Sequence, residues 1–195
     1  MGLRDILTGR HEVKGPAPDR LFAISTAYVT LQAEHQIDPA GTAAIVFQAL
    51  ATSEFESTLR DMEEVVRATG GESGTLVSTE DDSYGYRWMV MRNGEGAPSV
   101  EDLAVAINAV SSSIETAGHG DRLLCAVFAF TDAAGHRIYF IYNYKRGYWY
   151  PFVPDPSSTQ ARLTERELQI KAQMASDLPI EPELERWFPL WGIPI

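Results

Sequence analysis

The chain has 195 residues and a formal net charge of -11 at pH 7; 45% of the residues are hydrophobic and one is cysteine. This length fits one domain, and four Trp, eight Tyr and eight Phe supply enough apolar surface for a core, which excludes a disordered chain. A single cysteine excludes a disulfide framework and a cysteine-based zinc site. The negative charge argues against a nucleic-acid partner, because such affinity depends on Lys and Arg neutralising phosphates.

The beginning of the sequence lacks the features of an export or lipid-anchor signal. No long apolar run is present near Met1, and Ile6 stands where an N-myristoylation motif needs Ser or Thr. No stretch reaches the roughly 18 apolar residues of a spanning helix. We therefore expect a cytoplasmic chain with no transmembrane segment, associated with a membrane at most indirectly. Residues 1–16 are predicted to form an arm that ends in Gly-Pro, followed by one domain over residues 17–195.

The first two helices are predicted from apolar residues at steps of three and four. One covers residues 18–36. The next starts at Ser53-x-x-Glu56, which has the spacing of a capping box, and ends at Gly70-Gly71. The residues expected to face inward from this second helix are Phe55, Leu59, Met62 and Val65.

Two later helices are also predicted from capping motifs. Ser99-x-x-Asp102 starts a helix that Gly118 ends. Thr164-x-x-Glu167 has the same spacing and starts a helix that runs to about residue 176.

The strands are predicted from β-branched and aromatic runs between turn residues. The segment 123–130 is apolar on both faces, which indicates a central strand covered on both sides. With helices and antiparallel strands in irregular alternation, we expect an α+β fold: a single domain with one antiparallel sheet covered by helices. The predicted strands are 44–47, 75–80, 85–92, 123–130, 137–144 and 148–153.

Residues that could support catalysis or bind a metal or cofactor are few and scattered. His119 and Asp121 lie in a Gly-rich turn, and Cys125 lies in an apolar strand, where a buried and inert thiol is expected. Phosphate-loop, dinucleotide-binding and nucleophile-elbow motifs do not occur. We therefore expect a non-catalytic protein with no cofactor and no metal. A small ligand-binding protein, or an enzyme with a polar pocket near His119 and Asp121, is the alternative.

Two segments have the composition of a recognition surface. Residues 139–152 are rich in Tyr beside a Lys-Arg pair; alternation places Phe140, Tyr142 and Tyr144 on one face of the strand. These aromatic side chains fit cross-strand packing as well as recognition. The tail, residues 178–195, is rich in Trp and Pro and must dock on its own sheet, on a second copy or on another protein. The candidate partner-binding residues are Tyr144, Lys145, Arg146, Tyr148, Trp149, Trp187 and Trp191.

The same segments carry a resemblance to a known family. Residues 1–10 (MGLRDILTGR), 142–154 (YNYKRGYWYPFVP) and 184–194 (LERWFPLWGIP) resemble PspAB, the PspA-associated proteins of actinobacteria and some archaea, and residues 16–22 and 123–128 fit as well. The family has no established catalytic residue to carry over. Its genes lie near PspA, the coiled-coil membrane-stress protein of the phage-shock response.

The resemblance implies an accessory or adaptor protein of the envelope-stress response. Its expected partner is a protein such as a PspA-type coiled coil. The order of elements is also similar to that of type III secretion chaperones, small α+β domains that often dimerise, so a chaperone-like topology and a homodimer are further expectations.

Overall fold

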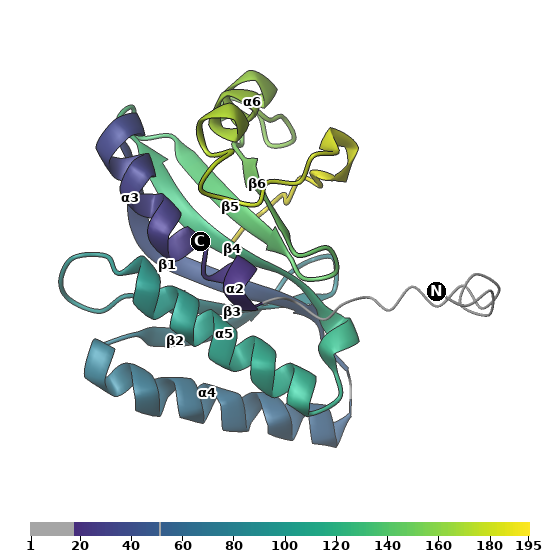
Figure 1. Cartoon of the computed structure of the whole chain (residues 1–195). Helices are drawn as coiled ribbons and strands as arrows, with labels where there is room; N and C mark the ends of the chain where they lie inside the picture. The colour runs from purple at the N-terminus through teal and green to yellow at the C-terminus, as the bar shows by residue number, and fades with distance from the viewer. Residues whose placement is uncertain (1–17, 51) are drawn as a thin grey trace, which may run out of the picture.

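A six-stranded antiparallel sheet forms the centre of the molecule (Figure 1). The computed structural model describes residues 18–50 and 52–195, so the predicted arm lies outside the described residues. The strand order is β2-β3-β1-β4-β5-β6. The strands are β1 (Ile37–Gln48), β2 (Leu76–Asp81), β3 (Tyr86–Arg92), β4 (Leu123–Asp132), β5 (Arg137–Asn143) and β6 (Tyr148–Phe152).

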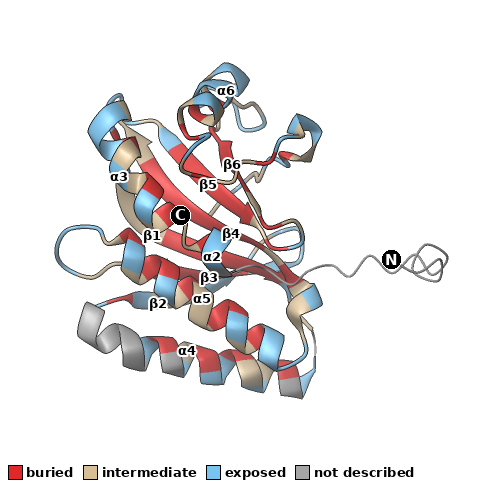
Figure 2. Ribbon diagram, in the orientation of Figure 1, coloured by how far each residue is buried: buried red, intermediate tan, exposed pale blue. Residues whose placement is uncertain are grey.

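The helices α2 to α5 lie over one face of this sheet (Figure 1). Their inward residues and the sheet side chains beneath them form the larger of two hydrophobic clusters, and the central strands β4 and β5 are buried along most of their length (Figure 2). The described helices are α2 (Pro18–Leu21), α3 (Ile24–His35), α4 (Ser53–Ser73), α5 (Val100–Thr116) and α6 (Thr164–Gln173), with short 3-10 turns at Gly120–Arg122 and Leu184–Arg186. The α+β class and the single antiparallel sheet are thus confirmed.

The period-two pattern of the strands sorts side chains between the two faces of the sheet. Phe128 on β4 lies opposite Phe140 on β5, and both belong to the helix-side cluster. Cys125 and Ile141 point to the other face. Strand β4 pairs with β1 and β5 and is buried along most of its length, which confirms that 123–130 is a central, covered strand.

Strand β1 is longer than the predicted segment 44–47. Pro39 and Gly41, residue types that usually interrupt a strand, lie inside β1. The register with β4 shifts between Pro39 and Ala43, and Gly41 has φ of +67°, a left-handed conformation that glycine adopts at low cost. A β-bulge therefore accommodates the residues that would ordinarily end a strand.

Two of the predicted capping boxes are wrong, for the same reason. The hydroxyl of Thr52, not Ser53, accepts a hydrogen bond from the backbone N–H of Phe55, while Glu56 pairs with Arg87 on β3. At α6 no side chain caps the helix. In both helices the expected capping glutamate pairs with an arginine outside the helix: Glu56 with Arg87 on β3, and Glu167 with Arg162, which precedes α6. The third prediction is confirmed: Ser99 accepts from Asp102 N at 3.1 Å.

The ends of the helices also differ in detail from the sequence-based expectation. Helix α4 continues through Gly70-Gly71 to Ser73, and the predicted first helix is divided by a turn into α2 and α3. The inward positions Phe55, Leu59 and Met62 are buried as expected; Val65 lies outside the described side chains. In the described part of the chain, no helix is both long and apolar enough to cross a bilayer.

Candidate functional site

The C-terminal tail docks on the face of the sheet that the helices leave open. Trp187, 4% exposed, stacks on Tyr150 with ring centroids 6.2 Å apart, and Trp191 packs edge-on against Phe152. The phenol of Tyr139 donates to Ile195 O at 2.7 Å. Of the three alternatives given for this tail, the structure therefore shows docking on its own sheet.

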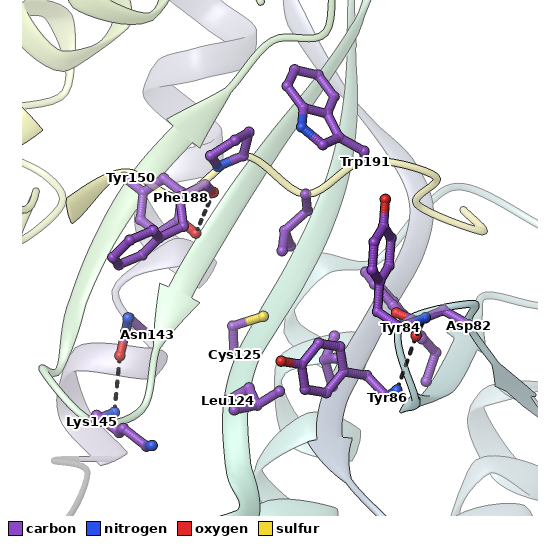
Figure 3. Close-up of a pocket in the computed structure, with 14 residues that line it drawn as sticks. Asp82, Tyr84, Tyr86, Leu124, Cys125, Asn143, Lys145, Tyr150, Phe188 and Trp191 are labelled. Atoms are coloured by element: carbon purple, nitrogen blue, oxygen red, sulfur yellow. Dashed lines mark hydrogen bonds between the residues drawn. The ribbon is translucent and has the colours of Figure 1, made fainter. Parts of the chain in front are cut away.

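A groove lies between this tail and the turn that joins β2 to β3 (Figure 3). Its volume is about 410 Å³. Leu124 and Cys125 of β4 form part of its floor, Tyr84 and Tyr86 one wall, and the tail around Trp191 the opposite wall. The site thus joins segments that are far apart in the sequence.

Asp82 fixes the aromatic wall of the groove. One carboxylate oxygen accepts from Tyr84 N at 2.8 Å and Tyr86 N at 2.9 Å; the other accepts from the indole of Trp88 at 3.0 Å. These bonds hold the turn in the conformation that presents Tyr84 and Tyr86, which are 64% and 38% exposed. Phe188, 59% exposed, stands on the tail side of the groove.

The floor of the groove has little nucleophilic reactivity. Burial raises the pKa of the Cys125 thiol to about 12, so the thiolate is scarce at neutral pH. The hydroxyl of Tyr150 donates to Phe188 O at 3.0 Å and is occupied by this bond. The groove can therefore hold an apolar group by contact. Cys125 is an inert part of its floor, as expected from its sequence environment.

Several of the predicted partner-binding residues belong to the core. Trp149 is fully buried, and its indole N–H donates to Arg20 O at 2.7 Å. Tyr144 and Trp187 are each 4% exposed. A partner would reach these rings only if the core opened. Their burial therefore argues against the prediction that they contact a partner.

The other predicted residues lie at or near the surface. Arg146 is engaged by Glu181 through two guanidinium nitrogens, and the guanidinium of Arg20 lies over the ring of Tyr148 at 4.9 Å. Lys145 is exposed and Trp191 is half-buried, and these two line the groove. The structure thus places Lys145 and Trp191 in the lining of one groove and adds exposed aromatic residues that the sequence did not single out.

His119 and Asp121 do not converge on a site. The His119 ring packs edge-on against Phe55, with centroids 5.1 Å apart. The Asp121 side chain is 72% exposed and pairs with Arg122 at 3.5 Å. Neither residue lines the groove. Across residues 18–50 and 52–195, no three His, Cys, Asp or Glu side chains gather as a metal site would require.

The fold and the groove describe a small α+β protein with an aromatic-walled groove on its sheet. The family model of PspA associated protein B matches residues 1–195, and the chain belongs to this family. Searches of curated proteins and of solved structures give no significant match. The likeness to type III secretion chaperones therefore stays a prediction.

Acid is expected to weaken the attachment of the tail through Glu181. Burial raises the pKa of this carboxyl, but hydrogen bonds from Arg146 and from Glu183 N outweigh it and leave the pKa below its ordinary value. A lowered native pKa contributes stability above the unfolded pKa of about 4.3, and this stability is lost as the pH falls through the native pKa. In urea unfolding, the unmodified protein should therefore be more stable than Glu181→Gln at about pH 5, and this difference in unfolding free energy should shrink toward about pH 3.

The matched control is Glu185→Gln, an exposed glutamate of the same segment. Its difference from the unmodified protein should stay small, below about 0.5 kcal/mol, over this pH range. If the effect of Glu181→Gln were the same at every pH, the ion pair with Arg146 would not be its cause.

Proposed function

We propose that this chain is a non-catalytic, cytoplasmic accessory protein of the envelope-stress response that binds a PspA-type coiled coil. The observation that carries the proposal is the whole-chain membership in the PspA associated protein B family. The expected contact surface is the rim of the groove, which we define as Tyr84, Tyr86 and Phe188 with Lys145 and Trp191.

The rim has the properties of a protein-binding surface. Large aromatic side chains are enriched at the centres of interfaces, where they supply contact area at low cost in conformational entropy. Tyr84 and Phe188 are more than half exposed, whereas Tyr150 and Trp187 beside them are buried. A helix of a coiled coil presents apolar side chains at regular steps, which is the shape an aromatic-walled groove accommodates.

The histidines and the cysteine among the described residues lie apart from one another, which supports a non-catalytic role. His136 is held by Asp132 at 3.2 Å at the end of a strand, and His119 packs on Phe55. Cys125 has a raised pKa. An acid, a base and a nucleophile within hydrogen-bonding reach of one another would be needed for the alternative, an enzyme with a polar pocket.

The partner is tested by purification from the native host with and without membrane stress. The tag belongs at the N-terminus, because Ile195 O is bonded to Tyr139 and a C-terminal tag would disturb the docked tail. We expect a PspA-like coiled coil at stoichiometric yield. Recovery of the chain alone under both conditions would contradict the proposal, and an elevated mass of that chain would indicate the homodimer instead.

Removal of the aromatic rim is expected to weaken this complex. The variant Tyr84→Ser, Tyr86→Ser, Phe188→Ser should lower the affinity for the coiled coil by at least about 30-fold, because central aromatic residues often contribute about 2 kcal/mol each. Titration calorimetry with the purified partner measures the change. Equal affinity would place the interface elsewhere.

The control variant carries the same kind of change on the helices. Val29→Ser, Val105→Ser and Leu168→Ser also replace exposed apolar side chains, which are 54%, 59% and 39% exposed. This variant should bind the coiled coil as the unmodified chain does. A comparable loss of affinity in both variants would show that replacing exposed apolar side chains weakens binding wherever they lie, and not at the rim in particular.

A further inference from the structure

The groove has the dimensions and walls of a small-molecule site. Its volume of about 410 Å³ falls within the range of about 300–1,000 Å³ that is usual for ligand pockets. Rings of Tyr86 and Trp191 stand on its two sides, and the floor is apolar at Leu124 and Cys125 (Figure 3). Flat aromatic groups gain from edge-to-face or offset contacts with such rings beyond the burial of area alone.

The polar groups of the groove indicate the charge of the ligand. Asp82 already accepts three N–H hydrogen bonds, and the Tyr150 hydroxyl is bound to Phe188 O. Asn143 Oδ1 accepts the backbone N–H of Lys145. Lys145 lines the groove, and its ammonium has no hydrogen-bond or ion-pair partner among the described residues. Asp82 keeps its negative charge, but both of its oxygens already accept hydrogen bonds, and it lies on the opposite side of the groove from Lys145 (Figure 3). Lys145 is therefore the charged group of the groove that is left to pair with a ligand.

We propose that the groove binds a small aromatic acid. The flat ring system lies between the β2–β3 turn and the tail, and its carboxylate pairs with the ammonium of Lys145. This binding goes beyond the proposed function and does not depend on it, because it requires only the chain itself. Since the acid and a coiled coil would contact the same rim, a bound acid would also compete with the partner.

Charge complementarity favours this occupant over the chain's own N-terminal residues. The segment 1–17 contains Arg4, Arg10 and Lys14 against two acidic residues, so it would bring like charge toward Lys145. An apolar peptide would leave the ammonium unpaired. An aromatic acid satisfies both the apolar walls and the cation.

The probe is naphthoate, compared with its neutral analogue naphthylmethanol, titrated into the full chain by calorimetry. We expect saturable binding of naphthoate, with about fivefold lower affinity for the alcohol, the effect of one partly exposed ion pair. Amide NMR shifts should change at Leu124, Lys145 and Tyr86. Equal affinity for acid and alcohol, or shifts confined to another surface, would overturn the proposal.

Two variants separate the cation from the cavity. Lys145→Gln should remove the preference for the acid, whereas Arg137→Gln, the same loss of charge at the other end of β5, should preserve it. Leu124→Trp fills the floor and should lower the affinity for both probes at least about tenfold. Thermal unfolding of this variant checks that the fold persists, and if it does not, Lys145→Gln alone decides.

Other occupants give distinguishable results. Binding that appears only after deletion of residues 1–17 would show that the chain's own segment fills the groove and would overturn the proposal. The titration contains no coiled coil, so its failure leaves the rim variants to test the proposed function. Conversely, failure to bind the coiled coil would not affect the acid-binding proposal, which the naphthoate titration tests separately.

Discussion

Replacement of Trp149 by Ala is expected to lower the free energy of unfolding by about 4 kcal/mol. The ring is fully buried between Phe128, at 5.7 Å, and Tyr142, at 5.2 Å between centroids. The substitution opens a large cavity and leaves Arg20 O without its indole donor. Because domains are stable by only about 5–15 kcal/mol, such a loss removes a large share of the total.

Urea unfolding measures this change, with Trp191→Ala as the matched control. Trp191 is half-buried on the opposite face, where it packs on Phe152 and forms part of the groove wall, so its loss should cost about 1–2 kcal/mol. A change below about 1 kcal/mol for Trp149→Ala would be inconsistent with a central structural role. It would also return Trp149 to the candidate partner-binding residues.

Trp149 illustrates why composition alone is ambiguous about function. A run of Tyr and Trp beside Lys145 and Arg146 is typical of a recognition surface, and equally of cross-strand packing. The alternation of faces within 139–144 was predictable and is confirmed, because a strand has a strict period of two. What the alternation leaves open is whether each face is covered, since that depends on helices and a tail far away in the sequence.

The class of the fold and most elements follow from local signals. The hairpin of β2 and β3, the central strand β4 and the Ser99 cap of α5 were all predictable from nearby residues. The errors arise where an arginine outside the helix competes with the local cap. Glu56 and Glu167 have capping-box spacing, yet each carboxylate is held by an arginine. An ion pair with a guanidinium is a stronger interaction than the local cap it replaces.

The groove was less predictable than the fold. Its walls come from the β2–β3 turn and from the tail, which are separated by about half of the chain and meet only because both flank β4 on the same face. Tyr84 and Tyr86 at a hairpin turn, where polar residues are usual, were the signal that could have indicated an exposed aromatic patch. The sequence could not show that Tyr84 and Tyr86 lie near Trp191, because this requires knowing how the strands pair.

Removal of the Glu167 carboxylate is expected to destabilise the protein by about 4 kcal/mol, as loss of one partner of a buried ion pair does. Glu167 is 1% exposed and accepts from Arg162 Nε at 2.8 Å and from Val153 N at 2.8 Å. In Glu167→Ala, the Arg162 guanidinium loses its counter-charge and Val153 N loses its acceptor. Urea unfolding, followed by tryptophan fluorescence, measures the effect.

The double variant Arg162→Leu, Glu167→Leu identifies the orphaned charge as the cause. Replacing both members of a buried pair by apolar groups is often close to neutral, so the double variant should be more stable than Glu167→Ala by about 2 kcal/mol. Recovery should be incomplete, because Arg162 also donates to Trp187 O at 2.7 Å and thereby anchors the tail. If the double variant were no more stable than Glu167→Ala, the unpaired charge of Arg162 would not be the cause of the lost stability. The loss would then come from the hydrogen bonds of Val153 N and Trp187 O, and Arg162 would hold the tail as a hydrogen-bond donor and not as a charge.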